Sequence, residues 1–444
     1  MDPEVILKRL LDRQEQRVGT LRTLESYYEG DHPLAFASLA FRKAFGNLFG
    51  PFADNWCETV VTATEERLKV DGFRFGPGDD TDSRAWEIWQ ANQLDSESKL
   101  AHTEALVCGE SYALVWPTPA GPRVTVEHPL QVITSHDPAN RRRTTAAAKC
   151  YQDDDGVWVA YLYTPDFVYR FRAEGQIHTG IPGKWVPEDR EGTEDPAVQP
   201  NPLAPIVPVV RIPNRPRMIA PPRSEIASVI PLQDAINKLC ADMMVTSERT
   251  SDSQRYVLGW EGAVDPETNQ PKNMPFNPRD PLWVIGDPED GGQVRVGQFQ
   301  AGDITGFIKA IEMFVQHIAS QTRTPPHYLA PGADRLSGES IKSSESGLVS
   351  KVRDKQVVLG EAWEQVMRLC LRLDGASDRA SYVGAETVWA DPEIRSEAQA
   401  ADAALKRKEL GVPERQLWED LGYSPTQIER FAVEQLSQQF FPGG

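Results

Sequence analysis

The sequence predicts an α+β protein in which helices predominate, and three observations support this class. Several long segments repeat apolar residues at steps of three and four, which is the spacing of a helix that is buried on one face. The middle segment, 111–172, instead changes to a period of two, which is typical of strands. Clusters of Pro and Gly separate these stretches. With 444 residues, 40% hydrophobic and 25% charged, the chain predicts two or more ordinary folded domains.

The clearest single element is a very long helix over residues 337–373. Ser337 is its expected N-cap, and Glu339 places a carboxylate near the positive end of the helix dipole. At ~1.5 Å per residue this helix is about 55 Å long, so it requires a long surface to pack against. The prolines and glycine of 325–332 exclude a helix in the first third of 322–373. The apolar stripe of the long helix consists of Ile341, Leu348, Val352, Leu359, Trp363, Val366, Cys370 and Leu373.

The first half of the chain combines short helices with a sheet. The expected helices are 4–29, 55–68, 85–89 and 96–106, with a short strand at 70–75. The candidate strands, which we expect to form one meander sheet, are 111–116, 122–127, 130–134, 144–152, 156–163 and 166–172. Residues 187–222 carry ten prolines, and we interpret them as an extended connector rather than a domain.

The second half predicts two helices that bracket a small β insert. Pro231 suits the first turn of one helix, and Asp303 is the expected N-cap of the other, which ends near Thr322. Between them, the runs RYVLGW, PLWVIG and QVRVGQF in 254–300 read as strands. After the long helix we expect a β segment at 387–392 and helices at 393–410, 413–421 and 425–440.

No motif indicates catalysis or metal binding. The seven histidines form no HExxH or HxH pattern, and the five cysteines form no CxxC. The chain has no GxSxG, Walker A or GxGxxG sequence. We therefore expect no enzyme activity, no metal and no cofactor; a hydrolase with an unrecognised site in 110–186 is a minor alternative. No apolar run approaches the ~18 residues of a membrane helix, so no membrane partner is expected.

The charge balance restricts how the chain can meet nucleic acid. Lys and Arg number 47 and Asp and Glu 65, which gives a formal net charge of −18. A protein that holds DNA by releasing counterions should be basic. This chain should repel DNA at long range, so either DNA is not a partner or DNA must pass without sticking.

Four stretches carry a resemblance to a known family. They are NWCETVVTATEERLKVDGFRF, VIPLQDAINKLCADMMVTSERTSDSQRYVLGW, TPPHYLAPGADRLSGESIKSSESGLVSKVRDK and LKRKELGVPERQLWEDLGYSP. On these stretches the chain resembles the tailed-bacteriophage portal proteins of the SPP1-type (Gp6-like) family over about residues 5–435. The most specific of them is the TPPHYL…LSGESIK run.

The resemblance implies a mainly helical α+β portal-type subunit. Such subunits form a ring, usually of twelve, at one capsid vertex around a tunnel for double-stranded DNA. By position it implies a wing of helices and meander sheet, a helical-hairpin stem, a β-containing clip, a tunnel loop, a long tunnel helix and a helical crown. The boundaries are 1–223 for the wing, 224–250 and 303–322 for the stem helices, 251–302 for the clip, 323–337 for the tunnel loop, 338–390 for the long tunnel helix and return to the wing, and 391–444 for the crown.

The resemblance also implies partners: the large terminase, a head–tail adaptor, and the major capsid and scaffold proteins. It places the protein in the virion, and in the host cytoplasm during assembly. A non-conduit head–tail adaptor or scaffold-type protein is the alternative, which the absence of an open channel would favour.

Candidate functional residues follow from these positions. The candidates for the tunnel loop and for facing DNA are Leu329, Arg335, Leu336, Ser337 and Lys342. For Arg335 and Lys342, a surface ion pair is an equally good interpretation. The clip candidates are Arg255, Tyr256, Trp260, Trp283 and Arg295, and the ring-packing stem candidates are Ile236, Leu239, Met243, Phe307, Ile311 and Phe314.

Overall fold

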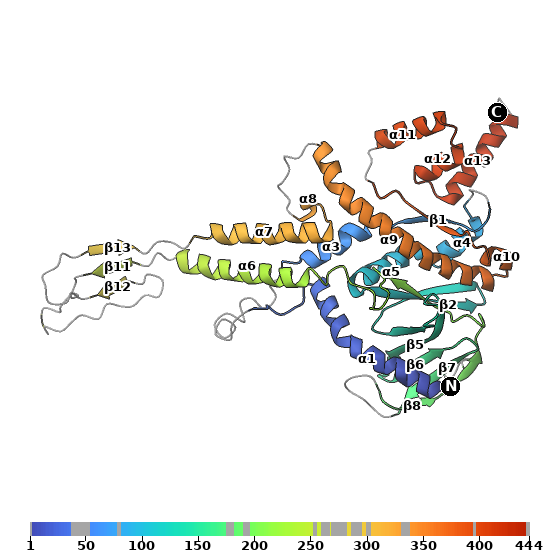
Figure 1. Cartoon of the computed structure of the whole chain (residues 1–444), viewed down its shortest axis with the longest axis horizontal. Helices are drawn as coiled ribbons and strands as arrows, with labels where there is room; N and C mark the ends of the chain where they lie inside the picture. Colours follow the sequence, from blue (N-terminus) through green and yellow to red (C-terminus); the bar gives the residue numbers. More distant parts are fainter. Residues whose placement is uncertain are drawn as a thin grey trace. The chain divides into compact units, whose positions relative to one another are not determined.

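The computed structural model describes most of the chain, and the statements below concern the described residues (Figure 1). These residues are 2–36, 54–77, 81–174, 182–189, 196–251, 255–258, 267, 282–285, 295–298, 303–329, 338–393 and 397–440. The chain divides into two compact units, which are described separately. Unit 1 comprises Met1–His32, Asn55–Ile230 and Ala319–Gly444, and unit 2 comprises Pro33–Asp54 and Pro231–Ile318.

Helices begin unit 1, as the sequence predicts. They are α1 (Pro3–Tyr28), α3 (Trp56–Glu65), α4 (Ser83–Ala91) and α5 (Leu94–Cys108). The side chains of Asp2, Asn55 and Asp82 cap the first three by accepting a backbone N–H of the first turn. Helix α5 ends at Gly109, whose φ is +92° and where an added Cβ would lie 2.9 Å from the Pro222 carbonyl oxygen. Glycine is therefore required at this turn.

The predicted single meander is wrong, because the strands form two sheets. The first sheet has the order β10-β2-β3 and contains β2 (Glu110–Thr118), β3 (Gly121–Glu127) and β10 (Val209–Pro213). The second has the order β4-β5-β6-β7-β8, with β9 beside β7, and contains β4 (Val132–His136), β5 (Thr144–Gln152), β6 (Trp158–Tyr163), β7 (Phe167–Ala173), β8 (Trp185–Pro187) and β9 (Val198–Pro200). The chain leaves the first sheet after β3 through a turn closed by Gln131 N–H donating to the His128 carbonyl.

The interpretation of 187–222 as a plain connector is also wrong in part. The segment includes β9 and β10, and β10 pairs with β2 from Val209↔Leu114 to Pro213↔Glu110. Residues 209–212 lie between two prolines and contain none, so all four keep the backbone N–H that pairing with β2 requires at alternate positions. A proline-rich composition therefore did not exclude a short buried strand.

Two apolar clusters hold the sheets in place. Helix α1 packs on the second sheet through Leu7, Leu10 and Leu11, which join Leu162 and Phe171 in one buried cluster. A second cluster contains residues of both sheets. Its members are Tyr112, Val132, Ala147, Tyr163, Val168, Val207 and Val209. The sheets therefore share a core and form one body.

The predicted long helix is confirmed as α9 (Gly338–Leu373), which has 36 residues. Its stripe is buried from Leu348 to Cys370, whereas Leu373 is half-buried and the Ile341 side chain lies outside the described part. In its second half, at Gly360 and Glu364, α9 contacts β14 (Glu386–Trp389), which pairs antiparallel with β1 (Val70–Arg74). The 36-residue helix thus finds the long packing surface that its length requires.

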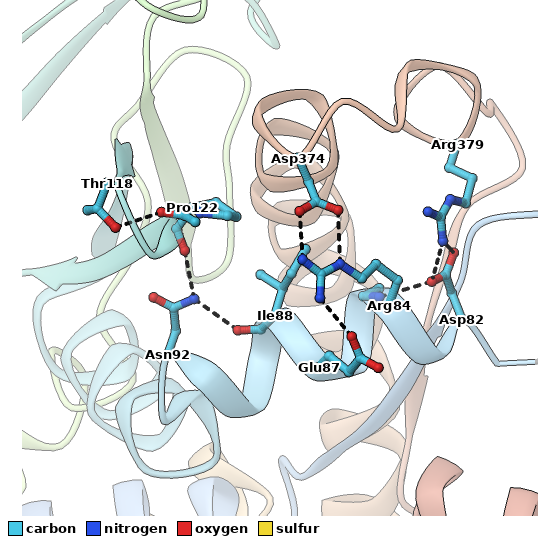
Figure 2. Close-up of polar contacts among 11 residues, drawn as sticks. Asp82, Arg84, Glu87, Ile88, Asn92, Thr118, Pro122, Asp374 and Arg379 are labelled. Atoms are coloured by element: carbon cyan, nitrogen blue, oxygen red, sulfur yellow. Dashed lines mark hydrogen bonds and ion pairs between the residues drawn. The ribbon is translucent and has the colours of Figure 1, made fainter.

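Polar contacts fix the C-terminal end of α9 to α4, as Figure 2 shows. Arg84 donates two hydrogen bonds to Asp374, at 2.9 and 2.7 Å, and a third to Glu87 at 2.7 Å. Arg379, in α10 (Ser377–Ala380), donates to Asp82 at 3.1 Å. Because Arg84 makes two hydrogen bonds to one carboxylate, the pair fixes the orientation of α4 relative to the end of α9.

The C-terminal segment of unit 1 is helical, as predicted. It contains α11 (Glu397–Glu409), α12 (Glu414–Asp420) and α13 (Pro425–Phe440). Arg74 of β1 donates to Glu419 of α12 at 2.7 Å. Trp418 and Phe431 meet edge to face with ring centroids 5.6 Å apart. Aromatic contact therefore joins α12 to α13.

Unit 2 contains the other two long helices and a small sheet. Helix α6 (Ile230–Ser251) places Ala241 and Val245 in a small cluster with Leu34. Asp303 accepts the Thr305 N–H at 2.8 Å and so caps α7 (Thr305–Thr322), whose last residues belong to unit 1. The three predicted strands are confirmed as β11 (Arg255–Leu258), β12 (Leu282–Ile285) and β13 (Arg295–Gln298), in the order β12-β11-β13.

Two further properties concern the cysteines and the hydrophobicity of the helices. All five cysteines lie among the described residues, where each is buried and none forms a disulfide. Among the described residues, no helix combines the length and the apolarity that a membrane crossing demands.

Candidate functional site

The DNA-facing candidates cluster around residues 323–337. Leu329 is fully buried in the single chain, which does not favour a DNA-facing role, and that role stays a prediction. Arg335, Leu336 and Ser337 lie outside the described residues. Lys342 is in the first turns of α9, but its side chain also lies outside the described part.

The expectation that the first third of 322–373 contains no helix is wrong. One helical turn, α8, spans Pro326–Leu329. Its first residue is a proline, and the first helical position tolerates proline because its N–H would have no partner there. This turn buries Leu329 and presents the Tyr328 hydroxyl to α3.

One buried arginine holds the chain on both sides of 330–337. Arg67 follows α3, and its side chain is only 4% exposed. Its Nη2 donates to Tyr328 Oη at 2.9 Å, before the segment, and to Glu345 Oε1 at 3.3 Å, after it. Its Nη1 donates to the Pro392 carbonyl at 3.2 Å. Arg67 therefore joins α8, α9 and the chain after β14 at one point.

The protonation states in this cluster are consistent with the contacts. Burial by itself would lower the pKa of Arg67, but Tyr328 and Glu345 raise it above its ordinary value, so the guanidinium stays charged. The Tyr328 hydroxyl accepts from Arg67 and donates to Glu66 at 2.6 Å. Burial, followed by Glu66, raises the pKa of Tyr328, which keeps the hydroxyl proton in place for that bond.

Replacing Arg67 by methionine should lower the free energy of unfolding by about 2–3 kcal/mol, because Glu345 and the Pro392 carbonyl lose a charged donor. Hydrogen–deuterium exchange of 344–352 should rise, since this part of α9 loses its tie to α3. Lys406→Met is the control: its pair with Asp402 is exposed, so the change should cost under ~1 kcal/mol. Unchanged exchange in 344–352 would show that Arg67 does not hold this segment.

A second buried network lies about two and three turns beyond Glu345 along α9. Lys351 and Lys355 are both buried, and both contact Glu225: Nζ lies 3.3 Å from Oε2 for Lys351 and 2.5 Å from Oε1 for Lys355. Lys351 also donates to the Thr322 carbonyl at 3.1 Å, and Lys355 donates to Asn214. The network therefore connects α9 with the end of α7 and with the segment before α6.

The pKa of each ionisable group in this network depends on the charges of the others. Burial alone would raise the pKa of Glu225, but the two ammonium groups lower it to about 2. Burial lowers the pKa of Lys355 to about 8, although Glu225 partly offsets this effect. The carboxylate is thus the group that makes two buried ammonium ions tolerable.

The stem candidates divide into two groups. Ile236 is fully buried within the single chain, and its packing against a neighbour in a ring stays a prediction. The others keep part of their surface exposed, as a residue that packs between subunits must in one isolated chain. These half-buried residues are Leu239, Met243, Phe307, Ile311 and Phe314.

The clip candidates lie mostly on the small sheet of unit 2. Tyr256 of β11 is opposite Trp283 in the parallel register with β12 and opposite Gly297 in the antiparallel register with β13. A Cβ at Gly297 would clash with the Tyr256 ring, so the ring covers this glycine. Arg255 and Arg295 are on β11 and β13, and Trp260 lies outside the described residues.

One cluster in unit 1 contains potential metal ligands that the sequence spacing did not reveal. Glu25, Glu104, Cys108 and His128 place one ligand atom each within 4.8 Å of one another. However, His128 Nδ1 accepts the Leu130 N–H at 3.0 Å. The ring proton therefore lies on Nε2, directed at Glu104 and Glu25, and leaves no lone pair there for a metal.

The cysteine of the cluster supports the same conclusion. Burial raises the pKa of Cys108, so its thiol keeps its proton, and it donates to Glu25 at 2.8 Å. A metal-bound cysteine would instead be a thiolate. The donor set fits a hydrogen-bonded connection between α1, α5 and the β3–β4 turn better than a metal centre.

Comparisons with known proteins cover nearly the whole chain. Residues 7–438 match a family model described as phage portal protein, SPP1 Gp6-like. A portal protein of Mycobacterium phage D29 is 32% identical over 459 residues, covering 96% of this chain and 87% of the relative. A portal protein of Mycobacterium phage L5 is 30% identical over 449 residues, with the same coverage.

Among solved structures, a chain from the virion of a native gene transfer agent (GTA) particle is similar at 11% identity. The TM-score is 0.42, and the likeness covers 90% of this chain and 89% of the other.

Proposed function

Because the chain belongs to the SPP1 Gp6-like family of phage portal proteins, we propose that about twelve copies form a ring around a tunnel for double-stranded DNA. The observation that carries the proposal is the family match over residues 7–438. A portal protein is a structural component of the virion, and the relatives are themselves portal proteins. The alternative of a non-conduit adaptor or scaffold protein is therefore not favoured.

The parts of the ring subunit follow from the sequence positions. The proposal assigns 1–223 to the wing, 224–250 and 303–322 to the stem, 251–302 to the clip, 338–390 to the tunnel helix and return to the wing, and 391–444 to the crown. The separate compactness of Pro231–Ile318, which contains the three-stranded sheet and most of both stem helices, supports the stem and clip assignment.

The clip is the proposed contact with the large terminase during packaging and with the head–tail adaptor later. Its candidates remain Arg255, Tyr256, Trp260, Trp283 and Arg295. Major capsid and scaffold proteins are the proposed neighbours of the ring during assembly in the host cytoplasm.

Charge supports passage of DNA rather than retention. With a net charge of −18, the subunit lacks the basic excess through which proteins hold a phosphate backbone. We place the few DNA contacts at the tunnel loop, 323–337, and at the start of the tunnel helix, with Arg335 and Lys342 as the respective candidates and without Leu329. Such contacts should weaken strongly as salt rises.

Deleting residues 331–336 should leave ring assembly intact and reduce the amount of DNA packaged. The deletion spares Leu329 and the Arg67 contacts with Tyr328 and Glu345, so the folded subunit keeps its anchor on each side. Ring mass and packaged DNA length, measured for wild type and deletion in parallel, test this expectation. Full-length packaging by the deletion would refute the role of the loop, and loss of folding would refute its independence from the core.

A further inference from the structure

A large cleft lies in unit 1 beside α9. It is bordered by α9, by the segment 213–218, by the turn around 141–144 and by residues 383–389, which include β14. Its volume is about 1380 Å³. We call it the α9 cleft. The DNA-facing, clip and stem candidates do not include any of its lining residues.

Exposed apolar side chains converge on this cleft. Met218, Val357 and Val383 line it, and they are 78%, 66% and 92% exposed. Ile219, next to Met218, is fully exposed. Single exposed apolar residues are ordinary, but several around one hollow indicate a surface that another molecule covers.

The segment that carries Met218 and Ile219 is held firmly. Asn214 and Arg223 close its base, with Arg223 N–H donating to the Asn214 carbonyl at 3.1 Å and Asn214 Nδ2 donating to the Arg223 carbonyl at 2.7 Å. Arg141 Nη1 donates to the Met218 carbonyl at 2.8 Å. The apolar tip is therefore presented on an anchored frame, which lowers the entropy cost of binding.

The lining of the cleft carries more arginines than carboxylates, in an acidic chain. Its charged lining residues are Arg141, Arg142, Arg211, Arg217, Arg353 and Arg368 against Glu361, Glu364 and Glu386. Arg142 and Arg368 pair with lining carboxylates, and Arg211 and Arg353 pair with carboxylates outside the lining, so Arg141 and Arg217 carry the basic excess. Burial, followed by Arg211, lowers the pKa of His136 to about 4, so this histidine adds no charge at neutral pH. The whole chain carries −18, so its remaining surface is acidic and complements the cleft.

We propose that the α9 cleft is a contact between neighbouring subunits and receives an acidic face of a second copy of this chain. The proposal rests on the ring proposed above. In a cyclic ring each subunit uses two different faces, one on each side, so a basic and apolar face must meet a different face of its neighbour. Covering Val357 and Met218 supplies the apolar burial, and the arginines supply the direction and register of docking.

Val357→Asp and Val433→Asp form a matched pair for the test. Both residues are valines on helices, α9 and α13, and both are 66% exposed, but only Val357 lines the cleft. Mass photometry of the full chain over a concentration series measures ring formation, and circular dichroism checks folding. Wild type and Val433→Asp should form rings at the same concentration, and Val357→Asp should need at least about tenfold more protein.

Met218→Asp, on the opposite wall of the cleft, should behave like Val357→Asp and decides the result if the α9 variant fails to fold. Rings of both cleft variants at the wild-type concentration would overturn the proposal. Rings that form normally but no longer enter capsids would also overturn it, because the occupant would then be a capsid component. If wild type and Val433→Asp form no ring, the ring itself fails, which is distinguishable from failure of the cleft alone.

Discussion

Replacing Trp363 by alanine should lower the free energy of unfolding by about 3–5 kcal/mol, because a fully buried indole is removed from the centre of unit 1. Trp363 meets Trp89 edge to face, with ring centroids 5.0 Å apart. Its Nε1 donates to His102 Nε2 at 2.8 Å. Burial lowers the pKa of His102 to about 3, so the ring is neutral and able to accept this bond. The alanine variant therefore loses packing and also leaves a buried acceptor without its donor.

Urea unfolding of the purified full chain, followed by tryptophan fluorescence and circular dichroism, measures this loss. Val433→Ala, on α13 and outside the α9 cleft, is the control: its side chain is largely exposed, so the change should stay within ~0.5 kcal/mol. If Trp363→Ala unfolded at the same urea concentration as wild type, the buried stripe of α9 would be assigned incorrectly.

Replacing Glu225 by glutamine should cost a similar amount, about 3–5 kcal/mol at neutral pH. The amide keeps the size of the side chain and removes the only charge in this network that opposes Lys351 and Lys355. Two buried ammonium groups would then lack a counterion. Each must either stay charged at a high desolvation cost or give up its proton on folding.

The glutamine variant should differ from wild type in how its free energy of unfolding depends on pH. In wild type, the Glu225 pKa of about 2 lies below its ordinary value, so its contribution is present above about pH 4.5 and is lost as pH falls toward 2. In the glutamine variant the folded state should bind fewer protons than the unfolded state near neutrality. Its stability should therefore rise between pH 7 and 8 more steeply than that of wild type, in which Lys355 titrates at about 8.

Glu361→Gln is the matched control for this experiment. Glu361 is also on a charged pair, with Arg142, but both side chains are largely exposed. The change should cost under ~1 kcal/mol and should leave the pH profile unchanged. Equal effects of the two glutamine variants would mean that the Glu225 network is not buried in solution.

The helices were predictable because their information is local. The stripe of α9 needs only residues of α9 itself, and the caps at Asn55 and Asp303 need only the next turn. The division into two sheets was not predictable, because it depends on the pairing of β10 with the edge of β2, which lies almost a hundred residues earlier in the sequence. A run of four residues without proline was the only local signal of this strand.

The polar networks escaped sequence reasoning for the same reason. Arg67 becomes a central residue only because α8, α9 and Pro392 meet beside it. For Lys351 and Lys355 a signal was present: their spacing places both on the apolar stripe, where a lysine needs a buried partner. Nothing in the sequence identified that partner as Glu225.

Residues carried over by position require the same geometric check. Leu329 and Ile236 occupy family positions of interest, yet both are buried in the single chain and stabilise it. The half-buried members of the same sets remain candidates, and the α9 cleft adds a surface that no motif marked. Position in a family suggests where to look, and burial decides which side chains are available.

The central claim is that this portal-family chain forms an open ring, and negative-stain electron microscopy with mass photometry on the purified protein tests it most directly. The account predicts rings of about twelve 49.5 kDa subunits, with a central channel wide enough for duplex DNA. A dimer or another small closed assembly without a channel would contradict it.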